Sequence, residues 1–338
     1  MNAPGHGIPA RLAVHGLTIE VQRPEGHLPA VRDVSFELGA GECVALVGES
    51  GSGKSLTALS LGGLLPPGAR VRSGKIEFEG NDLLVPGVDM RAVRGRSIAF
   101  VFQNPMSSLD PLVRVGRQIE ETMEAHRIGN ARSRRARAIE LLELVDVHNP
   151  SRRVRDFPHQ FSGGMRQRVM IASALAANPK ILVADEPTTA LDVTVQAQIL
   201  SLLRSLSDEF DLSVLLITHD LAVARQIAGR VIVMYAGRVL EVAATQTLVT
   251  KPDHPYTEAL IALVPDIEDG AELPAPIPGT PMPAWQAGDA CPFVGRCPYE
   301  EPQSRETPWR LTAISPGHLS ACAVPRPQRR HRHPSEVA

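Results

Sequence analysis

The sequence predicts an α/β fold in which helices cover the faces of a largely parallel β-sheet. Five short apolar runs are bounded by turn residues, as is typical of strands that are buried on both faces. Longer stretches with helical spacing lie between them, and such alternation is typical of α/β proteins. The runs are ECVALVG, SIAFVFQ, KILVADE, SVLLITHD and VIVMYAG, and the helical stretches include SLTALSLGGLL, VTVQAQILSLLRSLSDEF and LAVARQIAG.

Three segments depart from this alternation. Residues 12–38 contain LAVHGLTIEVQ and AVRDVSFEL, which we interpret as antiparallel strands. The segment from residue 104 to about 165 contains no convincing strand, so we predict a helical subdomain there. Sixteen of the 29 prolines follow Lys251, and proline disfavours long helices and central strands. We therefore predict a main domain over residues 10–250, a Pro-rich C-terminal extension over 251–325 and a disordered basic tail over 326–338.

The composition, with 43% apolar and 21% charged residues, is that of a globular protein. A net charge of -2 gives no global indication of a polyanionic partner. We interpret the arginine-rich stretch from Arg127 to Arg155 as a solvated helical face, with a contact surface as the alternative. No apolar run reaches the roughly 18–20 residues of a spanning helix, and the N-terminus lacks the pattern of a secretory signal. We expect a cytosolic protein that reaches a membrane only through a partner.

The stretch GESGSGKS at residues 48–55 follows a predicted strand and precedes a predicted helix. It matches the phosphate-binding pattern G-x-x-x-x-G-K-[ST] in the context that this pattern requires. Lys54 can reach the β- and γ-phosphates, and the Ser55 hydroxyl can ligate Mg²⁺. The loop alone leaves kinase, GTPase and transport ATPase open. The predicted nucleotide-binding residues are Gly48, Glu49, Ser50, Gly51, Ser52, Gly53, Lys54, Ser55 and Leu56.

A second group of polar residues follows other strands. Asp185 and Glu186 end the strand ILVADE, at the edge where α/β sheets bind ligands. Asp185 suits a Mg²⁺ contact through water, and Glu186 suits a general-base or water-orienting role. Gln103 follows the strand SIAFVF, and His219 closes the strand SVLLIT. A lone histidine is more often structural, but this position after an Asp-Glu strand favours a functional role.

A second cradle of small residues precedes the helix VMIASALAA. Ser162, Gly163 and Gly164, followed by Met165, can present backbone N–H groups to an anion at a helix N-terminus. One nucleotide rarely needs two such cradles in a single fold. The second cradle therefore indicates a nucleotide that is bound by another subunit.

Taken together, GESGSGKS, the Gln103 strand end, FSGGMRQR, ILVADEPTTALD and ITHD resemble the nucleotide-binding subunits of ABC transporters, over residues 12 to about 250. The resemblance implies a P-loop NTPase fold of the ABC type that binds ATP and Mg²⁺, the metal held through Ser55, Gln103 and Asp185. It implies catalytic roles for Lys54, Glu186 and His219, and nucleotide sensing by Gln103. The loop from Ser162 to Met165 would act on ATP held by the partner subunit. The stretch Ala190-Leu191-Asp192 would lie at the dimer seam.

Two further stretches, FQNPMSSLDP and HPYTEAL, resemble the oligopeptide and dipeptide importer branch, which includes nickel importers. IPGTPMP, CPFVGRCPYE and HLSAC fit its C-terminal extension. The resemblance implies a second, paralogous ATPase subunit, two permease subunits and an extracytoplasmic solute-binding protein. It also implies a peripheral location at the cytoplasmic face of the membrane. The transported solute is not readable from the chain.

Cysteines are concentrated in the extension, where Cys291, Cys297 and Cys322 match three places of the four-cysteine pattern of relatives. Ser304 stands where the fourth is expected. A [4Fe–4S] cluster with an outside ligand, zinc with His318 as fourth ligand, and no metal all stay open. Cys43 is expected to be a small core residue.

One further departure and two alternatives complete the prediction. No aromatic residue precedes Phe36 to stack on adenine, so His27 or apolar contacts are left for that role. One alternative is a soluble ABC ATPase that acts on nucleic acid or ribosomes, although a single core and a short helical insertion count against it. The other is a regulatory subunit, although Lys54, Asp185, Glu186 and His219 are intact.

Overall fold

The computed structural model describes residues 10–104, 108–189, 191–264 and 276–324. The predicted disordered tail at 326–338 lies outside the described residues, as do Ala190 and part of the stretch FQNPMSSLDP. Within these described ranges, no helix has both the length and the apolar character needed to cross a bilayer.

The larger sheet of the described chain has the strand order β11-β12-β10-β9-β3-β8-β7-β6. Its strands from β9 to β6 are parallel and correspond to the five predicted apolar runs, which confirms the α/β prediction. β10, β12 and β11 continue the sheet in antiparallel pairs. The bounds are β3 (Cys43–Val47), β6 (Ile98–Val101), β7 (Ile181–Asp185), β8 (Ser213–Thr218), β9 (Arg230–Tyr235), β10 (Arg238–Ala244), β11 (Thr312–Ser315) and β12 (His318–Ser320).

The parallel strands are buried on both faces because successive side chains point to opposite sides of a strand. In β3, Cys43, Ala45 and Val47 belong to one core cluster, whereas Val44 and Leu46 belong to another. Burial raises the pKa of the Cys43 thiol to about 12, as expected of a small core residue. Each strand thus links two hydrophobic cores.

The second sheet has the order β2-β1-β4-β5 and is antiparallel. The two strands predicted in residues 12–38 are confirmed as β1 and β2. The prediction missed β4, whose sequence ARVRSGKIEF has half of its residues exposed and lacks a regular apolar alternation. The bounds are β1 (Ala10–Arg23), β2 (Gly26–Gly39), β4 (Ala69–Phe78) and β5 (Asn81–Asp82).

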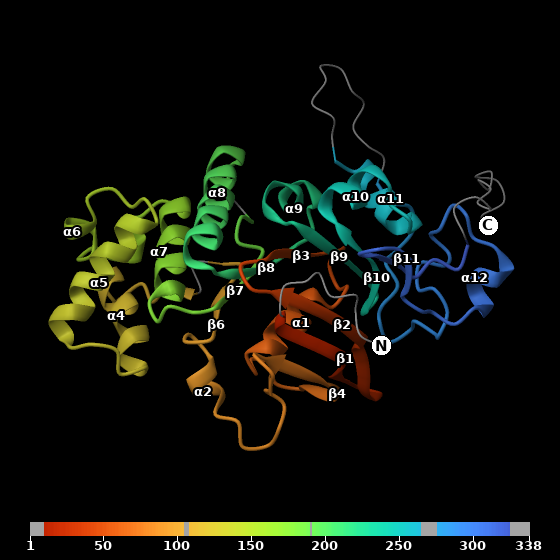
Figure 1. Ribbon diagram of the computed structural model, residues 1–338, viewed down its shortest axis with the longest axis horizontal. Coiled ribbons are helices and arrows are strands. Elements are labelled where there is room, and N and C mark those ends of the chain that lie inside the picture. Colours follow the sequence, from red (N-terminus) through yellow and green to blue (C-terminus); the bar gives the residue numbers. More distant parts are fainter. Residues whose placement is uncertain (1–9, 105–107, 190, 265–275, 325–338) are drawn as a thin grey trace, which may run out of the picture.

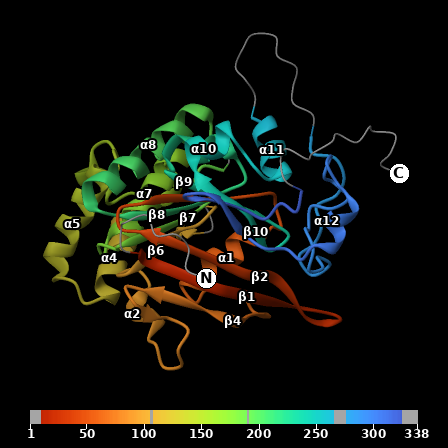
Figure 2. The same cartoon turned by 45° about the vertical axis from the view of Figure 1, so that its right-hand side comes forward.

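The helices complete a layered arrangement. α1 lies between the two sheets, whereas α8, α9 and α10 cover the opposite face of the larger sheet (Figure 1). The same order of layers is seen after a turn of 45° (Figure 2). The bounds are α1 (Lys54–Leu61), α2 (Met90–Val93), α8 (Val193–Phe210), α9 (Leu221–Ile227) and α10 (Thr245–Thr250).

Between β6 and β7, the described residues form helices and no strand, as predicted for this segment. Val115, Ile119 and Leu141 join the core cluster that also packs against α8 and α9. Among the arginines of the segment, Arg135 pairs with Glu120 at 3.1 Å, and both side chains are partly buried. The bounds are α4 (Val115–Ala125), α5 (Ala131–Leu144), α6 (Pro150–Arg153), a 3₁₀ turn (Pro158–Gln160) and α7 (Gly163–Leu175).

The C-terminal extension adds strands to the larger sheet, since β12 pairs with β10. Glu241 of β10 is fully buried, and its carboxylate accepts hydrogen bonds from the backbone N–H groups of Asp253 and His254 at 2.7 and 2.8 Å. His318 Nε2 lies 2.7 Å from the same carboxylate. The extension is therefore tied to the sheet by a buried carboxylate. Its helices are α11 (Pro255–Ala262) and α12 (Pro302–Glu306).

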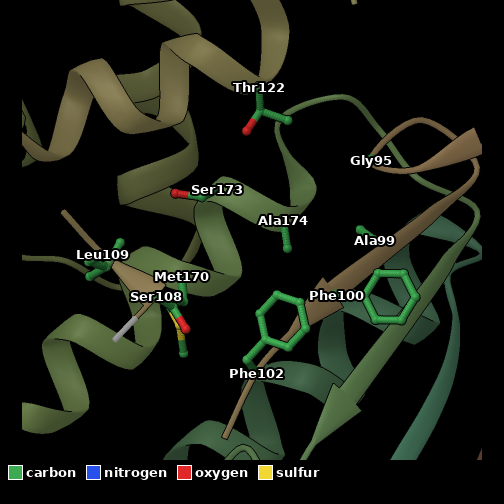
Figure 3. Close-up of a pocket in the computed structure, with 10 residues that line it drawn as sticks. All are labelled: Gly95, Ala99, Phe100, Phe102, Ser108, Leu109, Thr122, Met170, Ser173 and Ala174. Carbon is green, nitrogen blue, oxygen red and sulfur yellow. The ribbon is translucent and has the colours of Figure 1, made fainter. Parts of the chain in front are cut away.

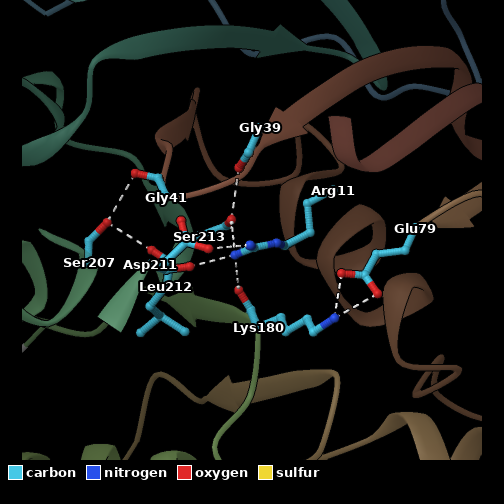
Figure 4. Close-up of polar contacts among 9 residues, drawn as sticks. All are labelled: Arg11, Gly39, Gly41, Glu79, Lys180, Ser207, Asp211, Leu212 and Ser213. Atoms are coloured by element: carbon cyan, nitrogen blue, oxygen red, sulfur yellow. Dashed lines mark hydrogen bonds and ion pairs between the residues drawn. The ribbon is translucent and has the colours of Figure 1, made fainter. Parts of the chain in front are cut away.

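One arginine joins the two sheets. Arg11 of β1 donates to the Asp211 carboxylate at 2.6 Å, to the Ser213 hydroxyl at 3.2 Å and to the Lys180 carbonyl at 3.3 Å (Figure 4). Lys180 in turn contacts Glu79, which follows β4, at 2.6 and 2.8 Å. The hydrogen bonds donated by Arg11 and by Lys180 therefore fix the starts of β7 and β8 to the antiparallel sheet.

We expect Arg11→Ala to lower the free energy of unfolding by about 1–2 kcal/mol, because backbone carbonyls lose a charged donor. Urea denaturation measures the change. Arg132→Ala removes an exposed arginine of α5 and should change stability by less than about 0.5 kcal/mol. Equal effects of the two substitutions would contradict the role given to Arg11.

Candidate nucleotide-binding site

The loop between β3 and α1 has no room for side chains at its base. A Cβ on Gly48 would lie 2.0 Å from the carbonyl oxygen of Met234, and one on Gly53 would lie 3.0 Å from that of Ala30. At Gly51, with φ 79°, no atom lies within 4 Å of the Cβ position. The loop is thus packed against protein at its ends and open in its middle. This arrangement fits a cradle of backbone N–H groups around phosphate.

Lys54, the first residue of α1, folds back into this loop. Its ammonium donates to the carbonyls of Gly48 at 2.7 Å and Glu49 at 2.9 Å, and only 6% of the residue is exposed. Burial lowers the pKa of Lys54, while the carboxylates of Glu186 and Asp185 oppose this shift. A buried ammonium of this kind is suited to bind phosphate.

Ser55 and Asp185 meet beside the loop. The Ser55 hydroxyl donates to Asp185 Oδ1 at 3.2 Å, although the two residues are 130 positions apart. Burial raises the pKa of Asp185, an effect that the bond from Ser55 partly offsets. Hydroxyl and carboxylate oxygens are the ligands that Mg²⁺ prefers. The donor set therefore fits the metal that the sequence predicts here.

Glu186 is the centre of a hydrogen-bonded group. Its carboxylate accepts from Gln103 Nε2 and from the Thr189 hydroxyl, both at 2.9 Å, and lies 3.0 Å from His219 Nδ1. Glu186 has φ 47°, in the left-handed region that side chains rarely adopt. Strained backbone of this kind is concentrated at functional sites. The structure thus brings Gln103, Glu186 and His219 together, as the sequence order alone could not.

The partners of Glu186 control its charge. Burial acts to raise its pKa, but the bonds from His219 and Thr189 and the charge of Lys54 outweigh burial, so that the pKa lies below its usual value. The carboxylate is therefore ionised at neutral pH. Sequence reasoning missed Thr189, and the only available signal was a hydroxyl three residues after the acid.

The second cradle lies apart from the first. Ser162 caps α7 and accepts a hydrogen bond from Met165 N at 3.4 Å, while Ser162 and Gly163 are exposed. Asp192 caps α8 through Val195 N at 2.9 Å. Both views place α7 away from α1 (Figures 1 and 2). A nucleotide on the first cradle is therefore not enclosed by the second one of the same chain.

The residues near the predicted adenine contact differ in their exposure. Phe36 is buried in the second core, and His27 is exposed in β2. Near the end of β1, the guanidinium of Arg23 lies 4.5 Å from the ring centroid of Trp285, which belongs to the extension. Sequence reasoning did not connect this ring to the β1–β2 hairpin.

The three late cysteines do line one cavity, together with Ser304 and His254. The cavity measures about 10 Å³, the space of roughly one water molecule. Among the described residues, no group of three or more His, Cys, Asp or Glu is arranged to hold a metal ion. His318, the expected fourth zinc ligand, is instead bonded to Glu241. The geometry supports neither the cluster nor the zinc alternative at Cys291, Cys297 and Cys322.

Comparisons with known proteins agree with this geometry. The family described as "ABC transporter" matches residues 31–189, and "Oligopeptide/dipeptide transporter, C-terminal region" matches residues 240–303. The chain is 47% identical to the dipeptide transport ATP-binding protein DppD of Bacillus subtilis, over 85% of this chain and 86% of that protein. The chain is an ABC transporter ATP-binding subunit of the oligopeptide/dipeptide family. The oligopeptide transport ATP-binding protein OppD of Salmonella typhimurium is 43% identical to it, over 93% of each chain.

Solved structures confirm the fold of this ABC subunit and its class of activity, an ATPase. The dimeric structure of MJ0796, a bacterial ABC transporter cassette, superposes with a TM-score of 0.62 at 31% identity, covering 69% of this chain and 98% of that one. The same cassette in a post-hydrolysis state bound to ADP and Pi gives the same values. The prediction of an ABC-type fold is confirmed.

Gly48 and Gly51 provide a matched test of the cradle. Gly48→Ala should abolish ATP binding and lower the melting temperature, because its Cβ meets the carbonyl of Met234. Gly51→Ala introduces the same methyl group into open space, so it should destabilise the protein less, by about 1 kcal/mol from its positive φ. Thermal unfolding and binding of a fluorescent ATP analogue measure both. A smaller effect at Gly48 than at Gly51 would contradict this view of the loop.

Proposed function

We propose that this chain is the ATP-hydrolysing subunit of a peptide importer, peripheral at the cytoplasmic face of the membrane. The proposal rests above all on the convergence of Ser55, Asp185, Glu186, Gln103 and His219 beside the phosphate loop. The relatives that are named as dipeptide and oligopeptide transport proteins support peptides as the solute. Peptides are the family expectation, and nickel or another small solute is the alternative.

In this proposal, the loop from Gly48 to Leu56 binds the phosphates of ATP, with Lys54 opposing their negative charge. Ser55, Gln103 and Asp185 would hold Mg²⁺, which, when bound, neutralises charge on the phosphate oxygens. Ionised Glu186 orients the attacking water and accepts its proton. Gln103 and Thr189 fix the Glu186 carboxylate from one side and His219 from the other.

A second ATPase subunit completes the site. Residues Ser162 to Met165, of which Ser162 and Gly163 are exposed, lie at a helix N-terminus, and backbone N–H groups there can bind the γ-phosphate of ATP held by the partner. Asp192 stabilises the neighbouring start of α8 at the proposed seam. We infer that the partner is a paralogous subunit, so that two ATP molecules lie between two different chains.

A groove next to Gln103 is the proposed docking site for a permease subunit. A cavity of about 220 Å³ lies between β6 and α7, and the rings of Phe100 and Phe102 stack there with centroids 6.0 Å apart (Figure 3). Phe102 is 39% exposed and directly precedes Gln103. A permease helix in this groove would therefore respond to any movement of the Gln103–Glu186 contact. Two permease subunits and an extracytoplasmic solute-binding protein complete the proposed transporter.

Glu186→Gln should retain ATP binding and slow hydrolysis by at least about 100-fold, because the amide cannot accept a proton. ATPase assays of the subunit with its partner measure this, and size-exclusion chromatography with ATP should show a trapped dimer. Glu209→Gln, an exposed change in α8, is the control and should leave turnover unaltered. Normal hydrolysis by the Glu186 variant would refute the assigned role.

Phe102→Asp should weaken co-purification with the permease at least about tenfold, because a charge enters an apolar groove, while ATP binding persists. Phe210→Asp changes another exposed phenylalanine, at the end of α8, and is the matched control. If the wild-type chain co-purified with ribosomes or nucleic acid and never with a membrane protein, the soluble alternative would replace the transporter.

A further inference from the structure

The C-terminal extension is hydrogen-bonded to the start of the phosphate loop. Glu49, the second residue of the loop, extends its side chain to Arg296 of the extension, 247 positions away. Two parallel bonds join them, from Nη1 to Oε2 at 2.6 Å and from Nη2 to Oε1 at 3.0 Å. A bidentate pair of this kind fixes orientation as well as distance.

Arg296 is itself held rigidly. Its Nε donates to the Pro278 carbonyl at 2.8 Å, and Nη1 donates to the Tyr235 hydroxyl at 3.2 Å. Its guanidinium also lies over the rings of Tyr235 and Phe293, 5.7 and 5.8 Å from their centroids. The side chain is 5% exposed. Because these contacts hold the Arg296 side chain, its position determines that of the Glu49 carboxylate.

The extension also binds the backbone of Glu49. The N–H of Glu49 donates to the hydroxyl of Tyr256 in α11 at 2.8 Å, and Tyr256 is fully buried. Tyr256 packs against Tyr235 with ring centroids 4.7 Å apart. The side chain of Glu49 is thus bound by Arg296 and its N–H by Tyr256, and both of these residues pack against Tyr235.

Lys54 also forms hydrogen bonds with the start of the phosphate loop, but a bound phosphate would compete for them. An ammonium has three N–H donors. They now face the carbonyls of Gly48 and Glu49 and the hydroxyl of Ser52. A bond from Lys54 to phosphate therefore gives up at least one contact with the loop. The contacts of Arg296 with the Glu49 side chain and of Tyr256 with the Glu49 N–H do not involve the Lys54 ammonium, so they can persist when Lys54 turns to phosphate.

We propose that Arg296 is a positioning residue for ATP, which keeps the start of the phosphate loop in its binding geometry through Glu49. The inference rests on the proposed function of this loop as the ATP site. A loop that is fixed before binding loses less conformational entropy when ATP arrives. Loss of the Glu49–Arg296 pair should therefore weaken ATP affinity more than it slows the chemical step.

The test compares Glu49→Gln, Arg296→Gln and the double variant in the full chain with its partner subunit. Each single change should raise the Kd for a fluorescent ATP analogue and the KM for ATP about tenfold, with kcat changed less than about twofold. The double variant should be no worse than either single one, because both remove the same contact. Arg296→Lys keeps the positive charge but cannot form the two parallel bonds of a guanidinium, so it should recover only part of the affinity for ATP.

Arg310→Gln, at an exposed arginine of the same extension, is the matched control and should leave Kd and KM unchanged. A lower melting temperature of the Arg296 variant with unchanged Kd and KM would show a purely structural brace and overturn the inference. Additive effects in the double variant would also overturn it. Failure of the wild-type protein to bind ATP would instead overturn the proposed function.

Discussion

Burial of the parallel strands on both faces is the constraint on which the site depends. Because alternate residues of β3, β6, β7 and β8 enter two different cores, these strands cannot shift along one another without exposing apolar side chains. Their carboxyl ends then lie at one edge of the sheet. The phosphate loop, Gln103, the pair Asp185-Glu186 and His219 all follow these ends. The geometry of this polar group is thus set by the apolar packing of the strands that precede it.

The sequence predicts this arrangement well where local pattern and chemistry coincide. The five parallel strands are near-continuous apolar runs, and the residues that follow them carry the polar groups of the site. Pattern fails where apolar alternation is lacking: half of the residues of β4 are exposed, and β11 and β12 lie in the proline-rich extension, where they pair at the sheet edge. The contacts of Glu186 with Gln103 and His219 span 83 and 33 positions, so the sequence implies them only through the family resemblance.

Other features depend on tertiary contacts that no local pattern indicates. The phosphate-loop motif allows any residue at the position of Glu49, and the partner of Glu49, Arg296, lies 247 positions later in the sequence. The cysteine pattern, in contrast, did predict that Ser304 belongs with Cys291, Cys297 and Cys322, since all four line one cavity. The Ser304 hydroxyl is used locally, as the acceptor for Glu301 N at 3.2 Å. The cysteine pattern thus predicted where these four residues lie in the fold, but it did not predict whether they bind a metal.

The buried carboxylate of Glu241 has a consequence for how this protein can be divided. Its three hydrogen-bonding partners, the N–H groups of Asp253 and His254 and the ring of His318, all lie beyond residue 250. A fragment that ended there would lose all three of these partners and would open the edge of β10 to other chains. The nucleotide-binding core of this subunit is therefore not structurally independent of the C-terminal extension.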